Sequence, residues 1–124
     1  MTAALADALR ACAAGLYCEE AAAELLIRHG TFLRRPDFAA FIDAGTSTTD
    51  GTTPMASIGW DAALTALHTG RLPVSSGERS VLQLAASIAA GTPVSLRDTV
   101  TSLDNANLGL LVAAVRHAAG HRPR

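Results

Sequence analysis

The stretch from Ser80 to Ala90 constrains the fold more than any other part of the 124-residue chain. Its polar side chains, Ser80, Gln83 and Ser87, lie three and four residues apart and therefore share one face of a helix. A helix that is apolar around most of its circumference has to be surrounded by other elements. We therefore predict a mainly α-helical, compact domain that packs around a central buried helix at about residues 78–90.

The composition indicates one helical domain over residues 1–124. Hydrophobic residues make up 49% of the chain but aromatic residues only 4%, so the core has to be built mainly from Leu, Ala, Val and Ile. A domain of this length buries roughly two-thirds of its unfolded surface without disulfide or metal crosslinks. The basic residues are all arginine, which together with the many alanines indicates a GC-rich bacterial genome.

Charge and hydropathy argue against two classes of partner. The formal charge is −1 and the arginines are scattered along the chain, so we expect no nucleic-acid binding. The apolar stretches are far shorter than a membrane span, and Asp7 and Arg10 interrupt any signal-peptide core. We therefore expect a soluble, cytoplasmic protein with no membrane partner.

Residues 2–29 carry two apolar stripes that point in different directions. Leu9 and Leu16 belong to the first stripe, and the direction changes on either side of Gly15. Either one long helix changes its packing partners along its length, or Gly15 separates two helices. Because one interior glycine costs a helix only about 1 kcal/mol, we predict one long helix. We further predict that this helix pairs two copies of the protein, the alternative being a monomer in which both stripes are covered.

The middle of the chain changes character sharply. A small helix begins near Pro36 and contributes Phe38 and Phe41 to the core. Residues 45–54 consist only of Gly, Thr, Ser, Asp and Pro, which predicts a loop. The flanking segments suit a small two-stranded β-ribbon at about residues 41–58, which has to lie on the helices because an isolated ribbon is marginal in water.

The second half of the chain shows further helix patterns. One helix is predicted near residues 60–68, and the central helix begins at a capping box of Ser75 and Glu78. A short helix and a last helix follow, the last one capped by Asp104. The side chains that we expect to face inward from these two helices are Leu96, Val100, Leu103, Leu108, Leu111, Val112 and Val115. Residues 121–124 are expected to form a disordered tail.

Cysteine and histidine show no metal or redox pattern. Cys12 and Cys18 lack the CxxC spacing of zinc and redox sites, so we predict buried free thiols. His117 and His121 have a spacing that binds metals on helices, but Gly120 is expected to end the helix between them. We therefore predict no metal site, no cofactor and no catalytic residue.

One region resembles a known family. Residues 75–79, Ser-Ser-Gly-Glu-Arg, resemble the signature motif of ABC-type ATPase domains, and residues 101–104, Thr-Ser-Leu-Asp, resemble the D-loop of that family. Residues 93–98 stand where the Walker B strand of the family would be. The resemblance implies a phosphate- or nucleotide-binding site at a helix N-terminus, formed by Ser75, Ser76, Gly77 and Arg79.

The differences between this chain and that family favour one of two functional hypotheses. The chain has no GxxxxGK[ST] motif and no lysine, and Thr99 stands at the position of the catalytic glutamate. We therefore predict a non-enzymatic interaction or accessory protein that pairs with itself or with another protein. Nucleotide or phosphate binding by the Ser75-Ser76-Gly77 helix start is the alternative hypothesis.

Overall fold

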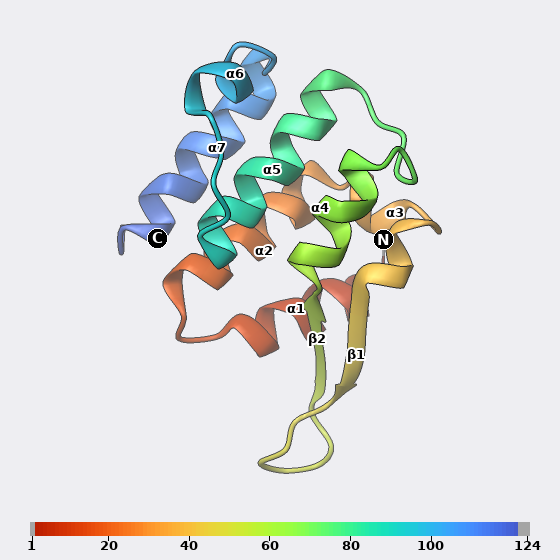
Figure 1. Cartoon of the computed structure of the whole chain (residues 1–124). Coiled ribbons are helices and arrows are strands. Elements are labelled where there is room, and N and C mark those ends of the chain that lie inside the picture. The colour runs from red at the N-terminus through yellow and green to blue at the C-terminus, as the bar shows by residue number, and fades with distance from the viewer. Residues whose placement is uncertain (1, 122–124) are drawn as a thin grey trace.

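The computed structural model describes residues 2–121, which form seven α-helices, one 3-10 helix and a two-stranded antiparallel sheet (Figure 1). In chain order the elements are α1 (Ala3–Ala13), α2 (Tyr17–His29), α3 (Thr31–Arg34), η1 (Phe38–Phe41), β1 (Ile42–Thr46), β2 (Pro54–Ile58), α4 (Trp60–His68), α5 (Ser76–Ala90), α6 (Leu96–Val100) and α7 (Asn105–Ala118). The predicted mainly helical fold with a small ribbon is confirmed. Of the predicted disordered tail, residues 122–124 lie outside the described residues, and the His121 backbone N–H donates to the Arg116 carbonyl at 2.8 Å.

Helix α5 is the central element, as its apolar sequence predicts. It packs against α2, α4, α6 and α7, and Leu82 on it is fully buried (Figure 1). Its first turn is closed by the predicted capping box: the Ser75 hydroxyl accepts from the Glu78 backbone N–H at 3.2 Å, and the Glu78 carboxylate accepts from the Ser75 N–H at 2.8 Å. Gly91 ends the helix in the left-handed conformation, with φ of +72°.

The prediction of one long N-terminal helix is wrong. Gly15 has φ of +89°, a left-handed conformation that interrupts the helix, and Leu16 after it is extended. The Glu20 carboxylate accepts from the Gly15 backbone N–H at 2.8 Å and so holds the turn in place. The two stripes therefore belong to two helices: α1 packs on the ribbon through β2, whereas α2 packs on α5 and α7 (Figure 1).

The ribbon covers α1. Its strands pair in register from Ile42 opposite Ile58 to Thr46 opposite Pro54, and Ala56 on β2 is buried against the helices. The predicted loop joins the strands and extends away from the helices (Figure 1). Within the loop, the Asp50 carboxylate accepts hydrogen bonds from the side chain and backbone of Thr53, which lower its pKa to about 2.

Several side chains predicted to be buried are exposed instead. Leu96 is 61% exposed, and the buried residue on α6 is Thr99, whose hydroxyl donates to the Ser95 and Leu96 carbonyls. Cys12 and Cys18 are exposed free thiols, because they lie next to the exposed turn between α1 and α2. In this turn Leu16 is exposed as well, so only the Leu9 part of the first predicted stripe faces the core.

The largest difference between prediction and structure lies on α7. Leu111 and Ala114 are buried, but Leu108, Val112 and Val115 are 42%, 51% and 53% exposed and do not face inward as predicted. The reason is the position of α7 at the edge of the bundle, where it packs on α2 and α5 with one side (Figure 1). Its opposite side carries the exposed Leu108, Val112 and Val115.

Candidate functional site

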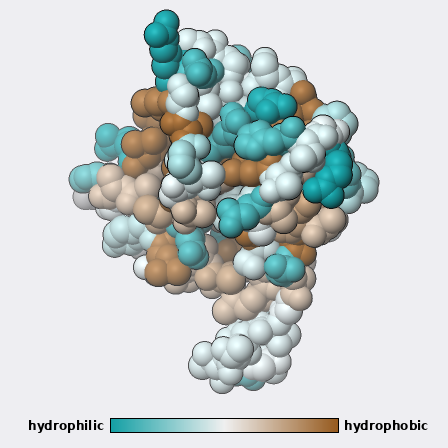
Figure 2. All heavy atoms as spheres, viewed as in Figure 1, coloured by the Kyte–Doolittle hydropathy of each residue, from teal (hydrophilic) through white to brown (hydrophobic). Residues whose placement is uncertain are grey.

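The exposed face of α7 is the main concentration of large hydrophobic side chains on the described surface. Leu108, Val112 and Val115 are spaced four and three residues apart, so they form one stripe along the helix. Figure 2 shows hydrophobic residues gathered over α6 and the neighbouring part of α7. Single exposed leucines are ordinary, whereas a contiguous apolar stripe is typical of an interaction surface.

An exposed glycine lies at the margin of this stripe, one turn before Val112. Gly109 is exposed in the interior of the helix, has no positive φ, and has nothing within 4 Å of the position that a Cβ would occupy. Neither backbone conformation nor packing within the described chain therefore requires glycine at this position. Because glycine in a helix costs roughly 0.5–1 kcal/mol relative to alanine, Gly109 weakens α7 without a gain inside the monomer.

A nearly buried polar contact fixes the C-terminal half of α7 to α2. His117 Nε2 lies 2.9 Å from Glu20 Oε1, and the two side chains are 12% and 13% exposed. The same Glu20 carboxylate also holds the Gly15 turn. Sequence reasoning missed this pair because the two residues are 97 positions apart and each has an ordinary surface explanation. The contact thus links the inner side of α7 to the start of α2.

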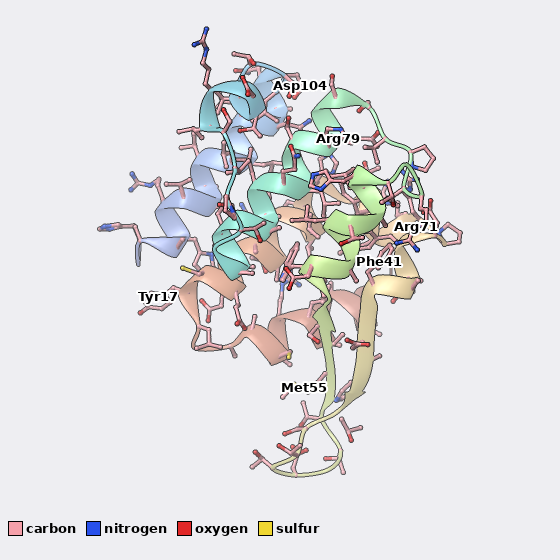
Figure 3. All side chains as sticks on the ribbon, in the orientation of Figure 1. Tyr17, Phe41, Met55, Arg71, Arg79 and Asp104 are labelled. Carbon is pink, nitrogen blue, oxygen red and sulfur yellow. The ribbon has the colours of Figure 1, made fainter. Side chains whose placement is uncertain are left out.

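The end of the α7 stripe meets another exposed apolar segment. Tyr17 and Leu16 are 46% and 54% exposed at the start of α2, and the Tyr17 side chain points away from the helices (Figure 3). A Cβ built at Gly120, just after α7, would lie 3.5 Å from the Tyr17 ring. The exposed apolar surface thus extends beyond α7 to the turn between α1 and α2.

The predicted phosphate site lies at the N-terminus of α5. Ser75, Ser76 and Arg79 are exposed there and Gly77 is half-buried, so the structure brings the predicted residues together at one helix end (Figure 3 labels Arg79). However, the Glu78 carboxylate already accepts from the Ser75 N–H, and its pKa is lowered mainly by that hydrogen bond. A carboxylate at this position repels a phosphate, so phosphate binding stays a prediction that the local charge disfavours.

The rest of the ATPase-like region has no site geometry of that family. Residues 93–98, which would be the Walker B strand, lead into α6 instead, and the Asp104 side chain accepts from the Asn107 N–H at 2.8 Å as a helix cap. The His117 and His121 spacing does not make a metal site either. Among residues 2–121, no group of three or more His, Cys, Asp and Glu side chains is placed to hold a metal ion.

A cleft lies on the other side of α2 from α7. It has a volume of about 320 Å³, is open to solvent, and is bordered by α1, α2, β2, the start of α4 and the end of α5. Its walls include Trp60 and alanines from four elements, and its polar groups are the Cys12 thiol, the Glu19 carboxylate and the Ser57 hydroxyl. This cleft was not predicted, because the residues that form it are scattered from position 9 to position 90.

Comparisons with known proteins leave the chain without an assigned relative. No protein-family model, curated protein or solved structure matches it. In addition, no helix within residues 2–121 is both long and apolar enough to cross a membrane. The exposed face of α7 and the cleft are therefore the features of the molecule that bear on its function.

Proposed function

We propose that the protein is a non-enzymatic interaction protein that forms a homodimer through the outer face of α7. The observation that carries this proposal is Gly109, a helix-interior glycine that the described monomer does not need. Close packing of a second helix supplies a reason for it, because the absence of a Cβ lets two backbones approach. The apolar side chains of the neighbouring stripe, Leu108, Val112 and Val115, supply the area that such a contact buries.

A second copy of the chain fits this face because the face is almost uncharged. Arg116 is the single permanently charged residue of α7, and His117 is turned toward Glu20 on the inner side. In a two-fold dimer the same residues meet on both copies, so a neutral stripe avoids repulsion between like charges. If two antiparallel helices cross near Val112, each Arg116 lies four residues from the centre, which separates the two by about 12 Å along the axis.

The proposed interface replaces the one that the N-terminal stripes suggested. Leu9 is 3% exposed and lies in the core, where α1 packs against β2. An interface that needs Leu9 would have to displace the ribbon. Leu16, by contrast, is exposed and precedes Tyr17, whose ring lies beside Gly120 just after α7.

The mass in solution tests this proposal. Light scattering at tens of micromolar protein is expected to give twice the chain mass of 12.7 kDa. Val112→Arg places a charge in the middle of the stripe and is expected to give a folded protein of 12.7 kDa, because burying an unpaired charge opposes association. Circular dichroism and thermal melting establish that the variant is folded.

A matched substitution controls for the added charge. Thr65→Arg replaces another exposed, β-branched residue, on α4, and is expected to leave the dimer mass unchanged. A mass of 12.7 kDa for the unmodified protein would refute the proposal, as would a Val112→Arg protein that remains a dimer.

Nucleotide binding is the competing hypothesis and has its own test. A ligand that binds only the folded state raises the melting temperature, so millimolar ATP with Mg²⁺ is a direct probe. We expect no shift, because Glu78 occupies the N-terminus of α5. An increase that disappears in Ser76→Asp would restore the phosphate site to consideration.

A further inference from the structure

Small side chains make up much of the lining of the cleft, which has a volume of about 320 Å³. Ala13 on α1, Ala23 on α2, Ala56 on β2 and Ala89 on α5 all line it, and none is large enough to fill the space between the elements. The volume is at the lower end of the roughly 300–1,000 Å³ that is usual for small-molecule sites. Its walls are mostly apolar, so a ligand that fills the cleft needs an apolar group.

The charged side chain in the lining of the cleft is acidic. Glu19 lines it, and no described residue forms an ion pair or hydrogen bond with the Glu19 side chain. Ala89 and Ala90 place the C-terminus of the 15-residue helix α5 at the cleft, and this helix has no basic residue in its last turn. The negative end of the helix dipole is therefore not compensated by its own side chains. No basic side chain lines the described cleft.

The Trp60 ring is a further feature of the cleft that favours a positively charged ligand. Trp60 lines the cleft at the start of α4 and is half-buried. The face of an indole ring attracts cations more strongly than the face of the other aromatic side chains. A carboxylate, a helix C-terminus and an indole thus lie around one apolar space, and each favours positive charge.

We propose that this cleft binds a small organic cation, namely an amine with an apolar or aromatic body. The apolar walls take the body, and Glu19 and the end of α5 attract the ammonium group. None of the lining residues belongs to α7, so the site does not depend on the proposed dimer. No covalent chemistry is part of this proposal.

Trp60 provides a reporter of binding, because it is the only tryptophan in the chain. The probe is phenethylamine, compared with its neutral analogue 2-phenylethanol and its anionic analogue 3-phenylpropanoate, each titrated against Trp60 fluorescence. Ligands of this size bind with a Kd on the order of 1 mM. We expect the amine to bind about tenfold more tightly than the alcohol, and the carboxylate to bind more weakly than both.

Two variants and one control separate the contribution of charge from that of shape. Glu19→Gln is expected to weaken amine binding roughly threefold to fivefold and to leave alcohol binding unchanged. Asp98→Asn removes the same charge from α6, outside the cleft, and is expected to change neither. Ala89→Leu fills the cleft and is expected to abolish the fluorescence response to all three compounds.

A second reporter guards against an indirect change in Trp60. In the Cys18→Ser background, Cys12 in the cleft wall is the remaining thiol, and phenethylamine is expected to slow its labelling by a maleimide. Equal affinity for amine and alcohol overturns the proposed ligand class. No response of either reporter at saturating amine, or an unchanged response in Ala89→Leu, overturns the site itself.

Discussion

Helices α5 and α7 look alike in sequence but have different surroundings. They are 15 and 14 residues long, and both are rich in Leu, Val and Ala. Six residues of α5 are buried, because α2, α4, α6 and α7 surround it, whereas Leu111 and Ala114 are the buried residues of α7. The pattern of apolar residues thus predicts a helix that needs packing partners, but not whether those partners come from the same chain.

The two helices therefore use apolar side chains differently. On α5 they fill the core, so their loss should unfold the protein. On α7 the outer ones contribute little to the monomer, and we propose that they hold two copies together. Substitutions of the same residue type in the two helices should separate these roles.

The largest difference is expected between two leucines. Leu82 on α5 is fully buried, and Leu82→Ala should lower the free energy of unfolding by about 2–5 kcal/mol, through lost burial and a cavity. Leu108 on α7 is 42% exposed, and Leu108→Ala should cost less than about 1 kcal/mol at concentrations where the protein is monomeric. Urea unfolding of both variants measures this, and similar losses would place Leu108 in the core.

A smaller and nearly equal effect is expected at the first turns of the two helices. Ser75 caps α5 and Asp104 caps α7, each through a side-chain oxygen that accepts from a backbone N–H. Ser75→Ala and Asp104→Ala should each cost about 1 kcal/mol, and Ser75→Gly only a few tenths. Equal losses in Ser75→Ala and Ser75→Gly, measured by thermal unfolding, would count against a simple cap.

His29 interacts with the carboxylates at the same two helix starts and makes the stability of the protein depend on pH. Burial lowers its pKa from 6.5, against the opposing carboxylates of Glu78 at α5 and Asp104 at α7. Because the unfolded chain then binds more protons, the stabilising contribution is complete above pH 6.5 and is lost as the pH falls toward the lowered value. His29→Leu should flatten the change in unfolding free energy between about pH 7.5 and 5. The exposed-tail variant His121→Gln should retain it.

Much of the fold follows from local sequence signals. The polar segment at residues 45–54 predicted the loop of the ribbon, and Ser75 with Glu78 predicted the start of α5. These features depend on a few neighbouring residues, so they can be predicted from the sequence. The break at Gly15 was missed because a single helical glycine has a small cost, and the contact that favours the break comes from Glu20.

The candidate sites depend on tertiary packing and were much less predictable. The exposure of Val112 follows from the position of α7 at the edge of the bundle, which its periodicity does not reveal. The cleft requires Glu19 and Trp60 to meet across several elements. The predicted residues at the start of α5 were brought together because they are contiguous in sequence.

Gly109→Ala is the sharpest test of dimerisation through α7, because its effect on stability should change sign with protein concentration. In dilute protein the substitution should raise the unfolding free energy by about 0.5–1 kcal/mol, since alanine favours the helix and meets no neighbour. At high concentration it should lower the unfolding free energy relative to the unmodified protein, because the added Cβ separates the paired helices. Equal stabilisation at both concentrations would contradict dimerisation through α7.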